Sequence, residues 1–136
     1  MSNNIVILLL GTNLGDKNNN LEIAKSLINK EVGEIIKVSN ILENEAVGFT
    51  SNNTFLNQKV EVITSLSPIK VLDTVKNIEN LMGRIYTQPM EGEKYVDRLI
   101  DVDILRYNNM LFISDRLNIP HHQNFTRGFV KELIFI

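Results

Sequence analysis

The stretch from Arg98 to Leu105, Arg-Leu-Ile-Asp-Val-Asp-Ile-Leu, constrains the fold of this chain more than any other. Branched aliphatic residues favour a β-strand, and side chains along a strand alternate between its two faces. The alternation predicts one face with Leu99, Asp101, Asp103 and Leu105 and an opposite face with Ile100, Val102 and Ile104. Two carboxylates on a strand that otherwise suits a core are costly to desolvate, unless they face solvent or bind a hard cation such as Mg²⁺. The strand alone leaves both alternatives open.

The composition limits the classes of function that the chain can serve. With 136 residues, 43% of them hydrophobic, we expect one domain over residues 1–136 with a real core. A formal net charge of −2 gives no electrostatic reason to bind nucleic acid or a membrane, and the absence of cysteine excludes thiolate sites. The longest apolar run, Ile5 to Leu10, is too short to span a bilayer, and the first residues lack the basic region of a secretory signal. We therefore expect a cytoplasmic protein.

Hydrophobic patterning predicts alternating strands and helices. Asn19 is the expected N-cap of a first helix with an apolar stripe at Leu21, Ala24, Leu27 and Ile28. Ser67-Pro68 starts a second helix, which Gly83 ends, with its stripe at Val71, Val75, Ile78 and Met82. Strands are expected at residues 5–10, 34–42, 55–64 and 98–105, with a polar connection at 43–53, a hairpin strand at 110–113 after Asn108-Asn109, and a closing helix at 126–136.

The order of these elements indicates an α+β protein with the ferredoxin-like βαββαβ fold. In that fold an antiparallel sheet carries both main helices on one face; here a small C-terminal hairpin and helix follow. The alternation from 55 to 64 directs Leu56, Val60 and Val62 toward the helices and places Phe55 and Asn57 on the uncovered face. An aromatic ring and an amide can stack on and hydrogen-bond a planar heterocycle, although an ordinary solvated face has the same pattern. The fold would gather both residues near Asp101 and Asp103.

Five blocks of sequence, in this order, resemble the 6-hydroxymethyl-7,8-dihydropterin pyrophosphokinase family of folate biosynthesis. The blocks are Gly11-Thr12-Asn13-Leu14-Gly15, Phe55-Leu56-Asn57, Ile78 to Arg84, Arg98 to Leu105, and Pro120-His121 with Arg127 to Val130. The resemblance covers nearly the whole chain. It implies transfer of a pyrophosphoryl group from MgATP to the hydroxymethyl oxygen of the reduced pterin, with release of AMP.

The resemblance also implies roles for individual residues. Asp101 and Asp103 would hold two Mg²⁺ ions, while Arg84 and Arg98 would be the catalytic arginines that neutralise phosphate charge. The long segment between these arginines would close over ATP as a lid. The pterin would be bound by Val47, Phe55, Asn57 and Phe129, and ATP by Glu79, Arg98, Ile104, Arg116, His121 and Arg127.

Two other interpretations remain open from the sequence. Tyr86 stands where many members of the family have a second basic residue, so the chain could be an impaired paralogue that binds pterin or nucleotide without turnover. A ferredoxin-like nucleic-acid-binding module would use Phe55 to stack a base, but such modules carry two or three sheet aromatics and a basic surface. We expect ATP and the reduced pterin as partners of a monomer, with no nucleic acid and no membrane.

Overall fold

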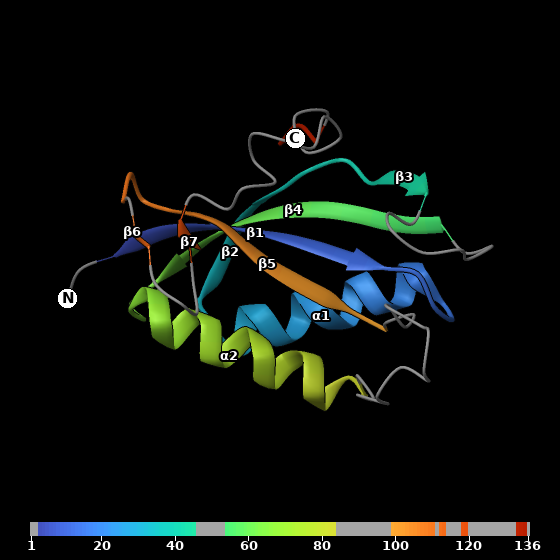
Figure 1. Ribbon diagram of the computed structural model, residues 1–136, viewed down its shortest axis with the longest axis horizontal. Coiled ribbons are helices and arrows are strands. Elements are labelled where there is room, and N and C mark those ends of the chain that lie inside the picture. Colours follow the sequence, from blue (N-terminus) through green and yellow to red (C-terminus); the bar gives the residue numbers. More distant parts are fainter. Residues whose placement is uncertain are drawn as a thin grey trace.

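The structure is a computed structural model that describes residues 3–45, 54–83, 99–110, 112–113, 118–119 and 133–135 (Figure 1). Its helices and strands follow one another as β1 (Asn4–Thr12), α1 (Lys17–Glu31), β2 (Glu34–Val38), β3 (Leu42–Glu45), β4 (Thr54–Thr64), α2 (Pro68–Leu81), β5 (Asp101–Tyr107), β6 (Phe112–Ile113) and β7 (Asn118–Ile119). None of the helices in these residues is both long enough and apolar enough to cross a membrane.

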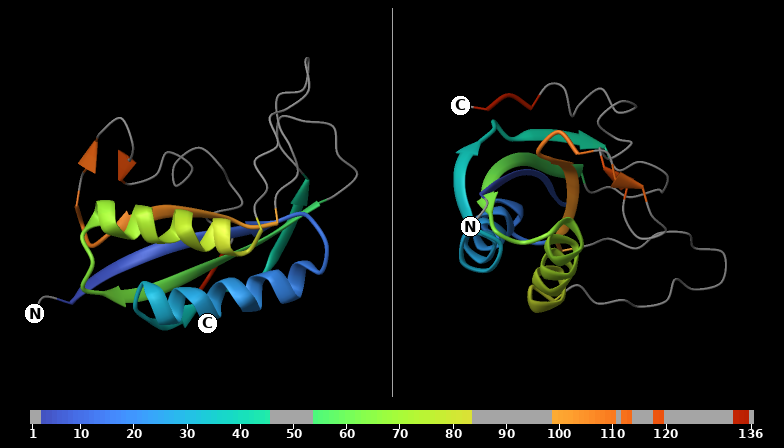
Figure 2. Two further views of the ribbon diagram at one scale, coloured as in Figure 1. Left: turned by 90° about the horizontal axis from the view of Figure 1, so that it is seen from below. Right: turned by 90° about the vertical axis from the view of Figure 1, so that its left-hand side faces the viewer.

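The main sheet has the strand order β2-β4-β1-β5, and β3 extends it by pairing with β4. Every neighbouring pair in it is antiparallel. Both helices lie against one face of this sheet, as the end-on view in Figure 2 shows. The predicted α+β, ferredoxin-like arrangement is confirmed.

The main core lies between this face of the sheet and the two helices. Each of its aliphatic side chains contributes about 1.5–3 kcal/mol when fully buried. The predicted stripes are confirmed, because the core includes Leu21, Ala24 and Ile28 of α1 and Val71, Val75 and Ile78 of α2 beneath Val6, Leu8 and Leu10 of β1. A smaller cluster of Leu9, Leu105 and Leu133 covers part of the opposite face. Strand β1 is therefore buried on both faces, as its continuous apolar run predicts.

The helix ends test the sequence signals for capping. Ser67 caps α2 as predicted, accepting a hydrogen bond from the Lys70 N–H with Pro68 in the first turn. Gly83 follows α2 with a φ of +83°, a left-handed conformation that favours glycine. The prediction for α1 is wrong: Asp16 is the N-cap, and its carboxylate accepts the N–H of Asn19 at 3.1 Å. A carboxylate so placed satisfies one of the free N–H groups of the first turn.

The strand predicted at residues 34–42 is interrupted. It forms β2 and β3, which pair in succession with the long strand β4, so residues 43–45 belong to a strand rather than to a connection. Local side-chain bonds occupy the backbone at the break. The hydroxyl of Ser39 accepts the Lys59 N–H at 2.8 Å and donates to the carbonyl of Asn40 at 2.7 Å, while Gln58 Nε2 donates to the Ser39 carbonyl at 2.9 Å. Such bonds compete with a regular ladder.

Two predictions for the C-terminal part are wrong where the structure describes the chain, and residues 126–132 of the predicted closing helix lie outside the described residues. The turn at Asn108 forms, with a φ of +50°, but β6 pairs with β7 rather than folding back on β5. Residues 133–135 are not helical: Phe135 forms a β-bridge with Ser39, and Ile134 exchanges two hydrogen bonds with Asn40. Backbone groups of residues 133–135 therefore bond to Ser39 and Asn40, in place of the bonds that a helix would supply.

A buried carboxylate links α2 to the outer strand β5. The side chain of Glu79 is only 1% exposed, and its Oε2 accepts the backbone N–H of Val102 at 2.8 Å. Its Oε1 lies 3.3 Å from Lys76 Nζ one turn earlier. A buried carboxylate needs such partners, since its desolvation is otherwise unfavourable.

We expect Glu79→Ala to lower the free energy of unfolding by about 1–3 kcal/mol, because the buried Val102 N–H loses its acceptor. Glu79→Gln keeps an acceptor oxygen and should lose less. The control is Glu22→Ala, which removes another glutamate in a helical i, i+3 pair with lysine, but one that is 69% exposed; its effect should stay within about 0.5 kcal/mol. Urea unfolding measures all three variants, and equal losses in Glu79→Ala and Glu22→Ala would contradict the link.

Candidate functional site on the open face of the sheet

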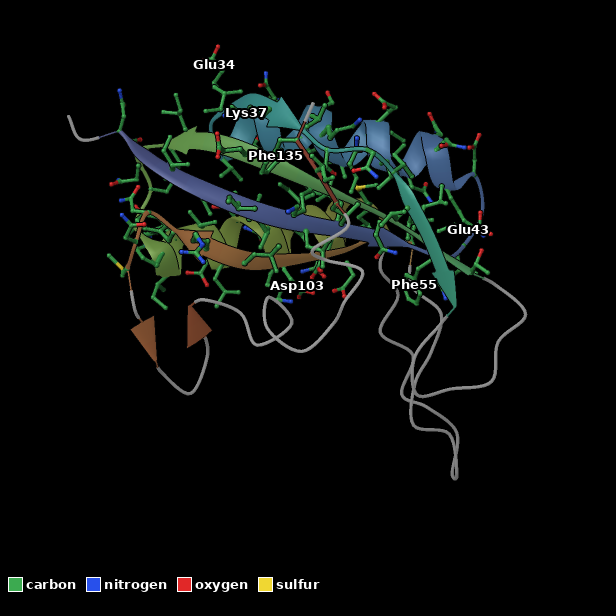
Figure 3. All side chains as sticks on the ribbon, turned by 90° about the horizontal axis from the view of Figure 1, so that it is seen from above. Glu34, Lys37, Glu43, Phe55, Asp103 and Phe135 are labelled. Atoms are coloured by element: carbon green, nitrogen blue, oxygen red, sulfur yellow. The ribbon has the colours of Figure 1, made fainter. Side chains whose placement is uncertain are left out.

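Asp101 and Asp103 project from the face of the sheet that the helices leave uncovered. Val102 and Ile104, which alternate with them, are buried in the main core beneath. Both aspartate side chains are half-buried, and Figure 3, which views the sheet from the side opposite the helices, shows Asp103 together with Phe55. The expectation that Leu99 shares this face is wrong: β5 begins at Asp101, so the alternation does not extend to Leu99, which packs against the main core.

The sheet register places a glycine between the candidate pterin and metal residues. Gly11 of β1 pairs with Asn57 of β4 on one side and with Asp101 of β5 on the other. A Cβ atom at Gly11 would lie 3.5 Å from Asn57 Oδ1 and 3.6 Å from Phe55 Cδ1. Asn57, Gly11 and Phe55 therefore form one surface, on which Gly11 leaves room for a Cβ in ordinary van der Waals contact with both neighbours. The predicted gathering of Phe55, Asn57, Asp101 and Asp103 on this face is confirmed.

The next row of paired residues along the sheet has an apolar side chain on the central strand and a charged side chain on each neighbouring strand. Leu9 of β1 pairs with Lys59 of β4 and with Asp103 of β5. Leu133 packs on Leu9, and the ring centroid of Phe135 lies 5.1 Å from Lys59 Nζ. Burial lowers the pKa of the Lys59 ammonium from its ordinary value. Residues 133–135 thus cover part of the open face near Leu9 and Lys59, and Figure 3 shows Phe135 across β1 from Asp103.

A buried polar network supports the start of β5 from the helix side of the sheet. The hydroxyl of Thr12 donates to the carbonyl of Leu99 at 2.6 Å. Asn20 Nδ2 lies 3.1 Å from Thr12 Oγ1, 2.8 Å from the Leu14 carbonyl and 3.4 Å from the Leu99 carbonyl. Sequence reasoning missed this network, although one signal was available: Asn20 directly precedes Leu21 at the edge of the buried stripe of α1.

Two residues assigned to ATP have side chains that lie away from the open face. Ile104 is 2% exposed and belongs to the main core, which leaves only its backbone groups for a contact with nucleotide. Glu79 lies between α2 and β5, where it accepts the Val102 N–H. The structure does not bring either side chain together with Asp101 and Asp103, and their contact with ATP stays a prediction.

The other predicted site residues lie outside the described part of the chain. They are Val47, Arg84, Arg98, Arg116, His121, Arg127 and Phe129. The lid predicted between Arg84 and Arg98 lies there as well. The geometry of the site therefore comes from strands β1, β4 and β5.

The donor set of this face fits a hard divalent cation that shares its coordination with phosphate. The described residues hold no group of three or more His, Cys, Asp or Glu side chains that could enclose a metal ion. Mg²⁺ does not require such a group, because it is commonly held by one or two carboxylates together with waters and phosphate oxygens of a substrate. Two half-buried aspartates separated by one residue on a strand supply that number of carboxylates.

Comparison with known proteins relates this arrangement to a family. The family model described as 7,8-dihydro-6-hydroxymethylpterin-pyrophosphokinase matches residues 7–135. The chain is 38% identical over 128 residues to a 2-amino-4-hydroxy-6-hydroxymethyldihydropteridine pyrophosphokinase of Porphyromonas gingivalis, covering 93% of this chain and 86% of that protein. It is 36% identical over 129 residues to the protein of the same name from Bacillus subtilis, covering 94% and 74% of the two chains.

Solved structures agree with the fold. The chain superposes on wild-type Plasmodium falciparum HPPK-DHPS with a TM-score of 0.66 at 21% identity, covering 98% of this chain and 34% of that chain. A second structure of the wild-type protein gives a TM-score of 0.62 at 21% identity, covering 90% and 37%. This chain thus spans about a third of those longer proteins, and at such identity the likeness concerns the fold alone. By the family match and the identity to the bacterial enzymes, the chain belongs to the 7,8-dihydro-6-hydroxymethylpterin-pyrophosphokinase family.

Proposed function

We propose that this chain transfers the pyrophosphoryl group of MgATP to the hydroxymethyl group of 6-hydroxymethyl-7,8-dihydropterin in folate biosynthesis. The hydroxymethyl oxygen forms a bond to the β-phosphorus, and the bond from that phosphorus to the oxygen bridging the α-phosphorus breaks. The products are AMP, the pterin diphosphate and the proton that the hydroxyl group releases. The observation that carries the proposal is the row of Asn57, Gly11 and Asp101 on the open face, in a member of the pyrophosphokinase family.

The pterin is proposed to lie over Gly11. Neighbouring strands are about 4.8 Å apart, so the backbones of Asn57 and Asp101 are separated by about 10 Å across Gly11. Because Gly11 has no side chain, a flat bicyclic ring can approach its backbone closely. The ring of Phe55 is proposed as a stacking surface. The amide of Asn57, whose Nδ2 donates to the Leu42 carbonyl at 3.4 Å, has the types of donor and acceptor that the polar edge of the pterin requires.

Asp101 and Asp103 are proposed as the ligands of Mg²⁺, with two ions implied by the family resemblance. When bound, Mg²⁺ withdraws charge from the phosphate oxygens and orients the reacting groups. Through Mg²⁺ the two carboxylates would hold the triphosphate beside the pterin, because they stand on β5, one strand away from Gly11. Phosphoryl transfer needs little covalent help from a protein, so this positioning supplies much of the catalysis.

The remaining assignments rest on the resemblance to the family. Arg84 and Arg98 are proposed to neutralise phosphate charge, and the segment between them to exclude water when ATP is bound. Val47 and Phe129 would complete the pterin site. The proposed contacts with the nucleotide are Glu79, Ile104, Arg98, Arg116, His121 and Arg127.

We also propose the setting in which the enzyme works. Residues 1–136 would act as one pyrophosphokinase domain, and the match of the family model to residues 7–135 supports this. The formal net charge of −2 does not attract nucleic acid, so we propose that the phosphate groups of ATP are held by local groups of the site. We expect the enzyme to act in the cytoplasm. We also expect it to be a monomer, which sedimentation of the purified protein can test.

Asp101→Asn and Asp103→Asn should each lower kcat/KM for MgATP at least about a hundredfold, because each removes a charge that holds the metal-bound triphosphate. The assay incubates protein with MgATP and 6-hydroxymethyl-7,8-dihydropterin and quantifies AMP. Asp73→Asn, on the exposed surface of α2, is the control and should keep wild-type activity. Full activity in both β5 variants would refute the metal assignment. If the folded wild-type protein produced no AMP but bound the pterin, it would instead be the impaired paralogue.

Gly11→Ala should raise the dissociation constant of the pterin about tenfold, equivalent to about 1.4 kcal/mol, because a methyl group enters the space proposed for the ring. The fold should tolerate the change, since the nearest neighbours of the new Cβ are at 3.5 Å and the backbone of Gly11 is not left-handed. Fluorescence titration measures pterin affinity, and thermal unfolding gives the control. Unchanged pterin affinity would show that the ring lies elsewhere.

A further inference from the structure

We propose that Thr12 and Asn20 are positioning residues that fix Asp101 from the opposite side of the sheet. They act through the carbonyl of Leu99, two residues before Asp101, and do not touch substrate or metal. The inference deepens the proposed function, because it rests on the role of Asp101 as a ligand of Mg²⁺.

The hydrogen bonds converge on one carbonyl group. Thr12 is fully buried and Asn20 is 6% exposed. The Leu99 oxygen receives a short hydrogen bond of 2.6 Å from Thr12 Oγ1 and a longer one of 3.4 Å from Asn20 Nδ2. Asn20 also donates to Thr12 Oγ1 at 3.1 Å, so the two side chains order each other. A buried amide and hydroxyl without these partners would be unfavourable, which makes the arrangement specific.

Asp101 needs such support because it is the first residue of β5. Its pairing with Gly11 is the last step of the ladder between β1 and β5, and residues 99 and 100, the described residues just before it, do not take part in that ladder. On the other side of Asp101, the Val102 N–H is held by Glu79 from α2. Side chains anchored in both helices therefore hold the backbone on either side of Asp101.

The chemistry of the site is sensitive to this support. Mg²⁺ requires nearly ideal octahedral geometry with ligands at about 2.1 Å, so a small shift of a carboxylate weakens binding. Residues that orient metal ligands commonly change metal affinity by about 10–100-fold when substituted. A support placed on the helix side leaves the open face free for substrates.

The chain contains a closely matched control for Thr12. Thr64 is 2% exposed, and its hydroxyl donates to the Val32 carbonyl at 2.7 Å and accepts the Leu66 N–H at 3.1 Å. Each threonine thus donates to one carbonyl and accepts one N–H. Thr64 pairs with Asn4 at the other end of β1, about 23 Å from Gly11 at the rise of a strand. Thr12→Val and Thr64→Val therefore remove the same kind of bond at the two ends of the sheet.

The first measurement concerns the support itself. Hydrogen–deuterium exchange should speed up over residues 99–103 in Thr12→Val but not in Thr64→Val, while both variants lose similar thermal stability. Thr12→Ser keeps the hydroxyl and should restore slow exchange. Asn20→Ala should resemble Thr12→Val. Unchanged exchange over residues 99–103 in Thr12→Val would overturn the proposal whatever the protein binds.

The second measurement concerns the metal. Binding of Mn²⁺ with α,β-methylene-ATP, whose α–β bridge cannot be cleaved, is followed by electron paramagnetic resonance. Thr12→Val should raise the dissociation constant of Mn²⁺ about tenfold, with Thr64→Val and Thr12→Ser near wild type. Equal Mn²⁺ affinity in Thr12→Val and Thr64→Val would overturn the positioning role. If Asp101→Asn bound Mn²⁺ as tightly as wild type, the proposed function would fail instead.

Discussion

The candidate site depends on the pairing of β1 with a strand on each side. Because β4 and β5 both take their register from β1, residues 57 and 101, far apart in the chain, are brought to the two sides of Gly11. A slip of one residue in either ladder would turn the corresponding side chains toward the helices. The buried apolar residues of the two outer strands prevent such a slip, since Val60 and Val62 of β4 and Val102 and Ile104 of β5 would then leave the core. The packing of the core thus also fixes the geometry of the site.

The two faces of the sheet carry different kinds of side chain near the row formed by Asn57, Gly11 and Asp101. The open face carries the groups suited to a planar heterocycle and a metal-bound phosphate, with Phe55 and Asp103 visible together in Figure 3. The helix face carries buried polar side chains, Thr12, Asn20 and Glu79, at the level where β5 begins. Their partners include backbone groups of residues 99 and 102, so the start of β5 is held from the helix side, opposite the proposed substrate site.

Local patterns in the sequence were sufficient to predict most of the helices and strands and the face of the sheet on which the strand side chains lie. Alternation placed Asp101 and Asp103 correctly, and the order of elements gave the fold, because both depend on periodicity and topology. The break between β2 and β3 was missed because it depends on hydrogen bonds from Ser39 and Gln58 to nearby backbone. The Thr12–Leu99 bond joins residues 87 positions apart, a relation that leaves no periodic signal in one sequence. Most arginine and histidine assignments rest on resemblance alone.

Among the described residues, strand β5 is the last in the order of the main sheet, and a strand at the edge of a sheet can recruit a strand from another molecule. At Val102 this edge is already occupied, because the outward N–H is bonded to the carboxylate of Glu79. A foreign strand would have to displace a buried charged group from its partners before it could pair there. The contact between α2 and β5 therefore also opposes the addition of a foreign strand at Val102, on the strand that carries Asp101 and Asp103.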